Sequence, residues 1–295
     1  MPLDGSALGQ TGAAIEHAID ARWLMAYAAS LGDAGPVYLD TSRPSGILGH
    51  PLFPACFEWP AILGYRGNSG TLTDAERLRG VHASHDLLVH RLARPGDKLR
   101  TVATLSTVER WPSGAYQRLR LDTVDAGGKP VCTTWYGTLF RGVPLNGGPV
   151  SLDDLPPWPE GKAPFSLLRE AVLPVVATAA HVYTEGSRIW NPIHTDTAVA
   201  KLAGLSGIIL HGTATLALCV SNIVNQECGG DPSRVRRVAA RFGAMVPVPS
   251  ELFLHVLSDT PVSGGRLLRF EALNSEGKPA IRDGRVLVGS SGGKT

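Results

Sequence analysis

The stretch that decides the fold of this chain is RIWNPIHTD, residues 188–196, followed by GLSGIILHG, residues 204–212. Asp196 can cap a short helix over 197–203, because an aspartate side chain accepts hydrogen bonds from the unpaired N–H groups of a first turn. Gly204 can end that helix, because glycine adopts the left-handed conformation found after many helices. The stretch therefore predicts a turn, a short helix and a second turn that leads into a new element.

The second turn leads into a longer helix. Residues 213–225 carry apolar side chains at helical spacing, which predicts one face packed against a sheet. His211 and Gly212 lie at its start, where N–H groups are unpaired and the helix dipole is positive. A glycine there lets a ligand oxygen approach the backbone closely.

Working outward, the chain repeats itself once. The turn GGKP at 127–130 recurs as EGKP at 276–279, about 150 residues later. Each turn joins two runs of strand-like composition, and a proline-containing turn precedes an earlier strand in each half. The four runs around the two turns are 116–124, 131–140, 266–273 and 280–288.

Between the two copies lies a proline-rich stretch. Residues 143–165 hold six prolines and no sustained helical or strand period, which is typical of a linker. We predict an N-terminal domain over 1–146, a linker over 147–164 and a C-terminal domain over 165–295, with the reactive site in the C-terminal domain.

The order of elements within each half favours one fold class. A helical stretch followed by several strands indicates α+β architecture with antiparallel sheets, since alternating strand–helix units are absent from the pattern. We predict a double hotdog, in which each of two curled antiparallel sheets wraps a central helix.

Composition limits the classes of partner. Hydrophobic residues make up 43% of the 295 residues and the formal net charge is +2, so we expect a globular chain that does not bind nucleic acid. No apolar run is long enough to span a bilayer, and we expect neither a signal peptide nor a membrane partner. The cysteines show no metal-ligand spacing, so we expect free thiols and a cytoplasmic protein. They are Cys56, Cys132, Cys219 and Cys228.

The residues around the two turns suit chemistry beside a thioester carbonyl. Adding water across a 2,3-double bond builds negative charge on the carbonyl oxygen, and one aimed N–H donor contributes roughly 3 kcal/mol to lowering the barrier. An imidazole can activate the water and return its proton. Here the imidazole would be that of His194, and the N–H donor would be that of Gly212.

The motif resembles a known family. Asn191-Pro192-Ile193-His194, an acidic residue two positions later, and Leu-His-Gly at 210–212 resemble the signature of the MaoC-like dehydratases and (R)-specific enoyl-CoA hydratases of the hydratase 2 type. The resemblance implies that His194 is the acid–base, Asn191 positions water or substrate, and Gly212 donates the oxyanion N–H. It implies no cofactor, because the acyl thioester itself carries CoA or phosphopantetheine.

One position departs from the family pattern. Where the family has a second acid–base, an aspartate, this chain has Ile189, which cannot transfer a proton. His194 then works alone, or Glu185 or Arg188 takes part of the role, or the chain catalyses a related reaction without that carboxylate. We assign His211 a supporting structural role, and Ile189 and Trp190 to contact with the substrate.

The first half lacks the full motif. Asp33 stands at the position of the family aspartate and Tyr38 at that of the histidine. One hypothesis is that Asp33 reaches the second-half site. In tandem proteins of this family the first half helps to hold the acyl chain, so the resemblance implies substrate contacts for Phe53, Phe57 and Trp59.

Several alternatives stay open at this stage. A cluster of His82, His85, Asp86 and His90 is predicted to lie on a strand, with His82 and His85 on opposite faces, and we predict no metal site. The leading function is a hydro-lyase acting on an acyl thioester of CoA or a carrier protein. The alternatives are a related lyase or cyclase on an enoyl substrate and a non-catalytic acyl-thioester-binding module. A monomer and a homodimer are both compatible with the sequence.

Overall fold

The computed structural model describes residues 3–68, 72–161 and 166–290, apart from the side chains of 66–68. The chain divides into two compact units. The first unit comprises residues 1–18, 57–90 and 98–158, and the second comprises 19–56, 91–97 and 159–295.

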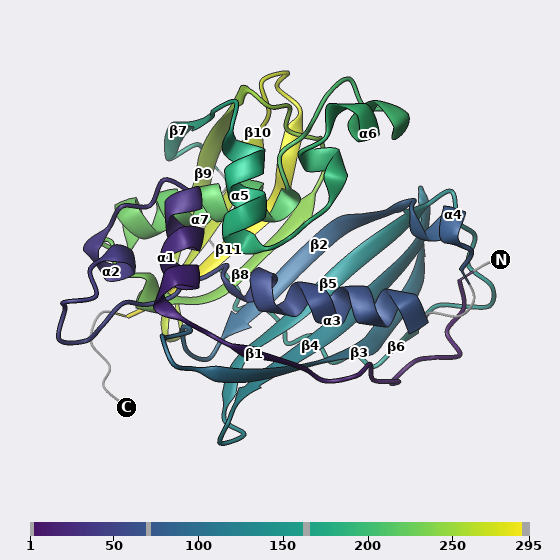
Figure 1. Ribbon diagram of the computed structural model, residues 1–295, viewed down its shortest axis with the longest axis horizontal. Helices are drawn as coiled ribbons and strands as arrows, with labels where there is room; N and C mark the ends of the chain where they lie inside the picture. Colours follow the sequence, from purple (N-terminus) through teal and green to yellow (C-terminus); the bar gives the residue numbers. More distant parts are fainter. Residues whose placement is uncertain (1–2, 69–71, 162–165, 291–295) are drawn as a thin grey trace. The chain divides into compact units, whose positions relative to one another are not determined.

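The first unit is an antiparallel sheet with one long helix on it. Its strands pair in the order β1-β3-β4-β5-β2, and β6 pairs with β3. Helix α3 packs through Ala61, Ile62 and Tyr65 against Leu105 and Leu119 of the sheet (Figure 1). The elements are β1 (Ile15–Ala18), α3 (Pro54–Asn68, in this unit from Phe57 on), α4 (Asp74–Arg77), β2 (Gly80–Val89), β3 (Lys98–Trp111), β4 (Gly114–Asp125), β5 (Pro130–Arg141) and β6 (Val150–Ser151).

The second unit repeats this architecture and adds short helices. Its strands pair antiparallel in the order β8-β11-β10-β9-β7, and α7 packs on β8 and β11. The elements are α1 (Ala21–Ser30), α2 (Pro36–Leu39), β7 (Arg169–Val175), α5 (Ala179–Ser187), the 3-10 turn η1 (Pro192–His194), α6 (Thr197–Leu202), α7 (Gly212–Glu227), the 3-10 turn η2 (Pro232–Arg234), β8 (Val235–Phe242), β9 (Ser250–Val262), β10 (Gly265–Leu273) and β11 (Pro279–Gly289).

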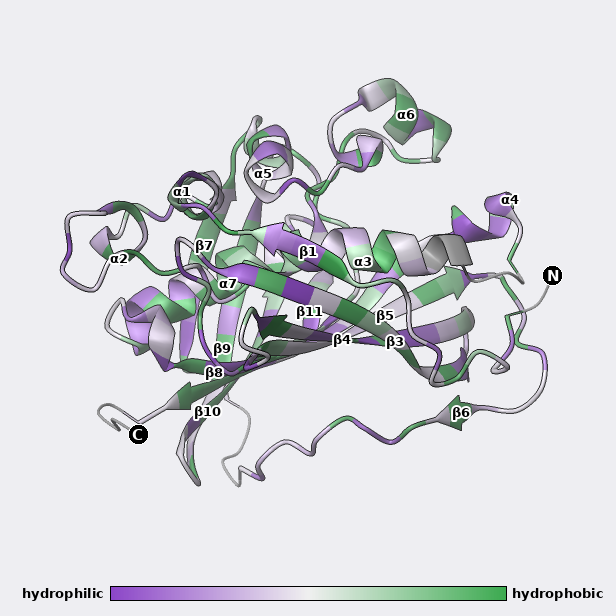
Figure 2. Cartoon of the chain, turned by 60° about the horizontal axis from the view of Figure 1, so that its bottom comes forward, coloured by the Kyte–Doolittle hydropathy of each residue, from purple (hydrophilic) through white to green (hydrophobic). Residues whose placement is uncertain are grey.

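Burial follows the residue pattern from which the elements were predicted. Buried and partly exposed residues alternate along most of β9. Hydrophobic and hydrophilic residues likewise follow one another along several strands (Figure 2). On α7, Leu216, Val220 and Ile223 are fully buried, as their helical spacing predicts. The α+β hotdog arrangement of sheet and central helix is therefore present in each unit.

The two Gly-Lys-Pro turns are built in the same way. Asp125 and Asn274 each accept two backbone N–H groups of their own turn on Oδ1, and the backbone N–H of each donates to the lysine carbonyl four residues on at 2.9 Å. Gly128 and Gly277 adopt positive φ angles of 77° and 70°, which only glycine adopts without strain. The sequence repeat is therefore a structural repeat.

The compact units do not follow the predicted sequential boundaries. Residues 19–56 lie in sequence between β1 and β2 of the first unit but belong to the second unit. Helix α1 lies beside α5 (Figures 1 and 2). Buried aromatic side chains explain the placement, because Tyr27 of α1 contacts Tyr183 of α5.

His82, His85 and Asp86 lie on β2, as predicted, whereas His90 follows the last residue of that strand, and the predicted opposite faces of His82 and His85 were wrong. A register shift between His82 and Ser84 brings the rings of His82 and His85 into edge contact, with centroids 5.4 Å apart. Asp86 accepts the indole N–H of Trp158 at 2.9 Å. Among the described residues, no group of three or more His, Cys, Asp or Glu side chains could hold a metal ion. No helix in the same residues is long and apolar enough to cross a membrane.

Candidate active site

The segment between α5 and α7 has the local structure that its sequence predicts. Asp196 caps α6, and its carboxylate accepts from the N–H groups of Ala198 and Val199 at 2.8 and 3.2 Å. Gly204 follows the helix with a φ of 80°. Asn191 caps the short turn η1, whose first residue is Pro192. These caps fix the backbone on both sides of His194.

The imidazole of His194 is neutral and held in one tautomer. Its Nδ1 lies 2.8 Å from the carbonyl oxygen of Ile209, and because a carbonyl only accepts, Nδ1 carries the proton. In the neutral ring the lone pair is then on Nε2, which no hydrogen bond from the described residues occupies. Burial lowers the pKa of His194 to about 4, although the bond to Ile209 opposes the shift. The ring is therefore uncharged at neutral pH.

His211 packs against one face of the His194 ring. The two rings stack with centroids 3.7 Å apart. Nε2 of His211 donates to the carbonyl of Ile189 at 3.2 Å and lies 3.3 Å from the hydroxyl of Thr184. Burial, with the neighbouring His194 ring, lowers the pKa of His211 to about 2. His211 thus ties the loop at Ile189 to the start of α7 by a backbone contact.

Gly212 is the first residue of α7, a helix of 16 residues. The side chain of the preceding His211 does not cap the helix, so the first N–H groups have no partner within it. A Cβ at position 212 would lie 3.2 Å from the Phe242 ring, so the glycine also allows α7 to pack closely on β8. Both the oxyanion role and the packing role are compatible with this geometry.

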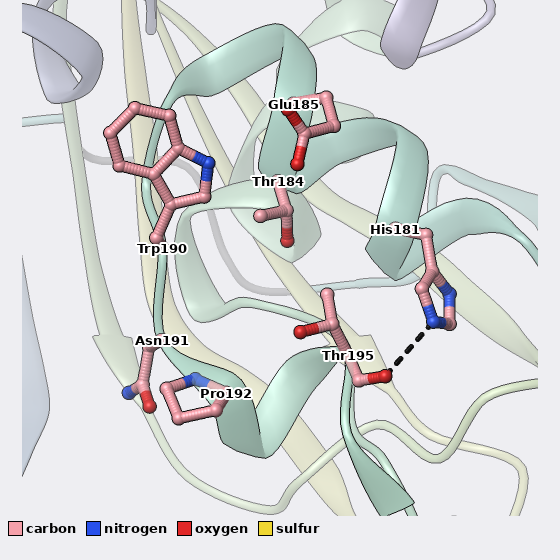
Figure 3. A pocket seen from close by; sticks show the side chains of 7 residues that line it. All are labelled: His181, Thr184, Glu185, Trp190, Asn191, Pro192 and Thr195. Atoms are coloured by element: carbon pink, nitrogen blue, oxygen red, sulfur yellow. Dashed lines mark hydrogen bonds between the residues drawn. The ribbon is translucent and has the colours of Figure 1, made fainter.

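A cavity of about 400 Å³ borders this segment (Figure 3). Figure 3 shows His181 donating from Nε2 to the carbonyl oxygen of Thr195, at 3.0 Å. The lining residues are His181, Thr184, Glu185, Trp190, Asn191, Pro192 and Thr195.

The cavity brings together some of the predicted site residues and not others. Asn191, Trp190 and Glu185 line it, whereas His194 and Gly212 do not. His181 and Thr184 do line it, and sequence reasoning missed them. On α5, His181 lies three residues before Thr184 and four before Glu185, so a helical pattern over 179–187 would have placed His181 beside both.

The remaining predicted residues lie elsewhere. Ile189 is 5% exposed, and the guanidinium of Arg188 lies over the ring of Trp23, 4.0 Å from its centroid. Phe53 packs edge-on against Trp23 in the second unit, and Phe57 is fully buried on α3. Trp59 packs against the core of the first unit. Contact of these three first-half aromatic residues with an acyl chain stays a prediction.

A second polar group occupies the corresponding positions of the first half. His50 accepts the N–H of Leu52 on Nδ1, so its Nε2 donates to Ser221 of α7 at 3.1 Å. Ser221 in turn donates to Asp33 at 2.7 Å. The rings of Tyr38 and His50 are 5.9 Å apart, which parallels the stacked pair in the second half.

Asp33 does not reach His194 through this group. Its partner Ser221 is nine residues beyond Gly212, roughly 13 Å along the helix at 1.5 Å per residue. Burial raises the pKa of Asp33, and hydrogen bonds from Ser221 and Asn225 oppose that shift. Asp33, which stands at the family aspartate position in the first half, is therefore bonded to a part of α7 distant from Gly212.

We expect Asp33→Ala to lower the free energy of unfolding by about 1–3 kcal/mol, because it leaves the buried Ser221 hydroxyl without its acceptor. Asp33→Asn keeps an acceptor oxygen and should lose less. Urea denaturation at pH 7 measures both variants. Activity per folded molecule should stay within about twofold, since Ser221, the partner of Asp33, is more than two helical turns from Gly212; a hundredfold loss in the folded Asp33→Asn protein would contradict this placement.

Comparison with known proteins agrees with the motif. Residues 166–266 match the MaoC like domain, and residues 6–134 match the FAS1-like, dehydratase domain region. A probable enoyl-CoA hydratase 2 of Dictyostelium discoideum is 27% identical over 118 residues, which is 40% of this chain and 39% of that protein. The chain spans 6% to 39% of the length of three curated relatives, a fatty acid synthase beta subunit and two enoyl-CoA hydratases 2.

Solved structures show the fold. A MaoC-like dehydratase from Phytophthora capsici superposes with a TM-score of 0.80 at 19% identity, covering 95% of this chain and 96% of that chain. A Mycobacterium tuberculosis protein described as having a double hotdog fold superposes with a TM-score of 0.58 at 18% identity, covering 95% of each chain. These findings confirm the resemblance inferred from the motif. The chain thus has the double hotdog fold, and its second and first halves are similar to the MaoC like domain and to the FAS1-like dehydratase domain region.

Proposed function

We propose that this chain is a hydro-lyase that adds water to a 2-enoyl thioester or removes it from a 3-hydroxyacyl thioester. The observation that carries the proposal is His194, a buried neutral imidazole with Nδ1 held by Ile209 and Nε2 unoccupied, beside the uncapped start of α7. The relatives that are enoyl-CoA hydratases 2 support the same chemistry.

In the proposed hydration, Nε2 of His194 takes a proton from water as the water oxygen bonds to C3 of the substrate. The electron pair of the double bond moves toward the carbonyl, and the N–H of Gly212 stabilises the enolate oxygen. A proton then returns to C2, so the net change is the addition of one water. Asn191 orients the water or substrate from the edge of the cavity.

The proton to C2 has three candidate sources. His194 can return the proton that it removed, which requires no second acid. Glu185 lines the cavity from the neighbouring helix α5, and its carboxyl group can deliver the proton instead if it first takes the proton that leaves the water. Arg188 has its guanidinium over Trp23, which makes it the weakest of the three candidates for proton transfer.

The proposed substrate is an acyl thioester of CoA or of a carrier protein, and the reaction needs no cofactor because the thioester itself acidifies C2. The closing experiment follows loss of enoyl-thioester absorbance with crotonyl-CoA and a longer 2-enoyl-CoA, and dehydration of both 3-hydroxyacyl-CoA enantiomers. Conversion supports the proposal. Tight binding without turnover would instead indicate a binding module, and a cyclic product from a hydroxylated enoyl-CoA would indicate the cyclase alternative.

The pH profile gives a separate prediction. His194 must be deprotonated to act as a base, and its pKa of about 4 keeps it so throughout the neutral range. We expect kcat/KM for hydration to stay level as pH falls from about 7 to 5 and to decline only near 4, whereas a histidine of ordinary pKa would lose activity below about 6.5.

This profile requires initial rates from protein held at pH 7 and diluted into the assay. The folded pKa of His50, lowered to about 3 by burial, lies below its unfolded value. The unfolded chain therefore binds more protons, and the stability from burying neutral His50 declines as pH falls below about 6.5. A fall in kcat/KM below about pH 6.5, measured in rapidly diluted protein that is still folded, would contradict the assignment of His194.

A further inference from the structure

Arg188 occupies a backbone conformation that an arginine rarely adopts. It ends α5 with φ 60° and ψ 29°, in the left-handed region. There the Cβ of an L-residue crowds its own backbone, and glycine is the usual residue at this position after a helix. Some contact must therefore favour Arg188 in this conformation.

Trp23 of α1 contacts Arg188 itself and also the preceding turn of α5. The guanidinium of Arg188 lies over its ring, 4.0 Å from the centroid, which is a favourable cation–π geometry. The indole N–H of Trp23 donates to the carbonyl of Gly186 at 3.1 Å, in the last turn of α5. Trp23 is 3% exposed, and Asp20 caps its own helix by accepting from the Trp23 backbone N–H at 2.7 Å.

The close approach of α1 to α5 leaves little freedom at this point. A Cβ added to Gly186 would lie 2.8 Å from Cβ of Ser30 and 2.9 Å from the carbonyl oxygen of Ala26. The backbone of α5 at Gly186 therefore packs directly against α1, in the same turn to which Trp23 donates its hydrogen bond. Trp23 is fixed on a helix that cannot shift toward α5.

The conformation of Arg188 sets the course of the next residues. The N–H of Ile189 donates to the Ser187 hydroxyl at 3.2 Å, and the carbonyl of Ile189 accepts from Nε2 of His211. His211 stacks on His194. A change in the backbone conformation of Arg188 would therefore rotate the Ile189 carbonyl away from His211 and move Trp190 and Asn191 at the cavity.

We infer that Trp23, from the first half of the chain, is a positioning residue that holds Arg188 in its left-handed conformation and thereby places the Ile189–Asn191 backbone against His211. Its effect on rate rests on the proposed hydratase function, but its effect on the Ile189–His211 hydrogen bond does not.

The test is a double-mutant cycle of Trp23→Leu with Arg188→Gly, because glycine adopts the left-handed conformation without help. We expect Trp23→Leu to lower kcat for crotonyl-CoA by about tenfold with KM changed by less than about threefold, since small displacements at a reacting site are costly. In the Arg188→Gly background the same change should cost at most about twofold. Equal losses in both backgrounds would show that Trp23 only packs α1 on α5 and would overturn the inference.

A second measurement separates this inference from the proposed function. The Nε2–H resonance of His211, observed by NMR in protein with ¹⁵N-labelled histidine, should broaden or exchange faster in Trp23→Leu and recover in the double variant. This result is obtained even if wild type converts no thioester. If Trp23→Leu fails to fold, Trp23→Phe keeps a smaller aromatic face and removes the N–H, and a smaller change of the same kind is expected. An unaltered His211 resonance in that variant would overturn the inference.

Discussion

We expect His194→Ala to lower kcat/KM for hydration of crotonyl-CoA by at least about a hundredfold, because a positioned acid–base group typically contributes 10²–10⁴-fold. The loss should be mainly in kcat, since the imidazole acts on the reacting proton and contributes little to binding of the thioester. The absorbance assay used for wild type measures the effect directly.

The matched control is His255→Ala, which removes a histidine of the same unit that bridges Glu170 and Glu271 on the sheet. It should leave kcat/KM within about twofold, because His255 lies on β9 and contacts neither His194 nor the cavity lining. A His194→Ala protein that retains its fold and most of its activity would exclude His194 as the base.

We expect Ile189→Asp to raise kcat by about tenfold or more. The change restores a carboxyl at the position where the family has its second acid–base, on a residue whose carbonyl already bonds to His211. Position 189 is 5% exposed, so burial would raise the pKa of the new carboxyl and keep part of it protonated, as a general acid requires. The same assay measures the gain.

Ile189→Asn is the isosteric control, because an amide has nearly the shape of a carboxyl but cannot transfer a proton. A gain in Ile189→Asp alone would show that the scaffold accepts a two-residue acid–base mechanism. Equal losses in both variants would show that the apolar side chain itself is needed, and that His194 completes the reaction with the help of the substrate or Glu185.

Much of the local structure was predictable because it depends on neighbouring residues. The cap at Asp196, the turn at Gly204 and the helix after His211 follow from short-range hydrogen bonds and backbone preferences. The two Gly-Lys-Pro hairpins follow from turn chemistry in the same way. The one local error, at His82 and His85, came from a bulge that strict alternation along a strand does not show.

The site could be predicted only in part. Spacing pointed to His194 and Gly212 as candidates, and the structure supplied the tautomer of His194, because only the fold brings the Ile209 carbonyl to Nδ1. His181 carried no motif and was missed, although it lines the cavity with Glu185. Asp33 was a candidate from its position in the repeat. In the structure it accepts a hydrogen bond from Ser221, far along α7 from Gly212.

The sequence by itself determined the class of fold, the repeat, and the motif that marks the second half. These depend on periodicity, turn residues and spacing, which are properties of the chain read in order. Only the tertiary structure decided that residues 19–56 pack with the second half, that Trp23 meets Arg188, and that two histidines stack as neutral rings. Those features depend on burial and on contacts between residues distant in sequence, and the free energy of such contacts is set by surroundings that no local pattern records.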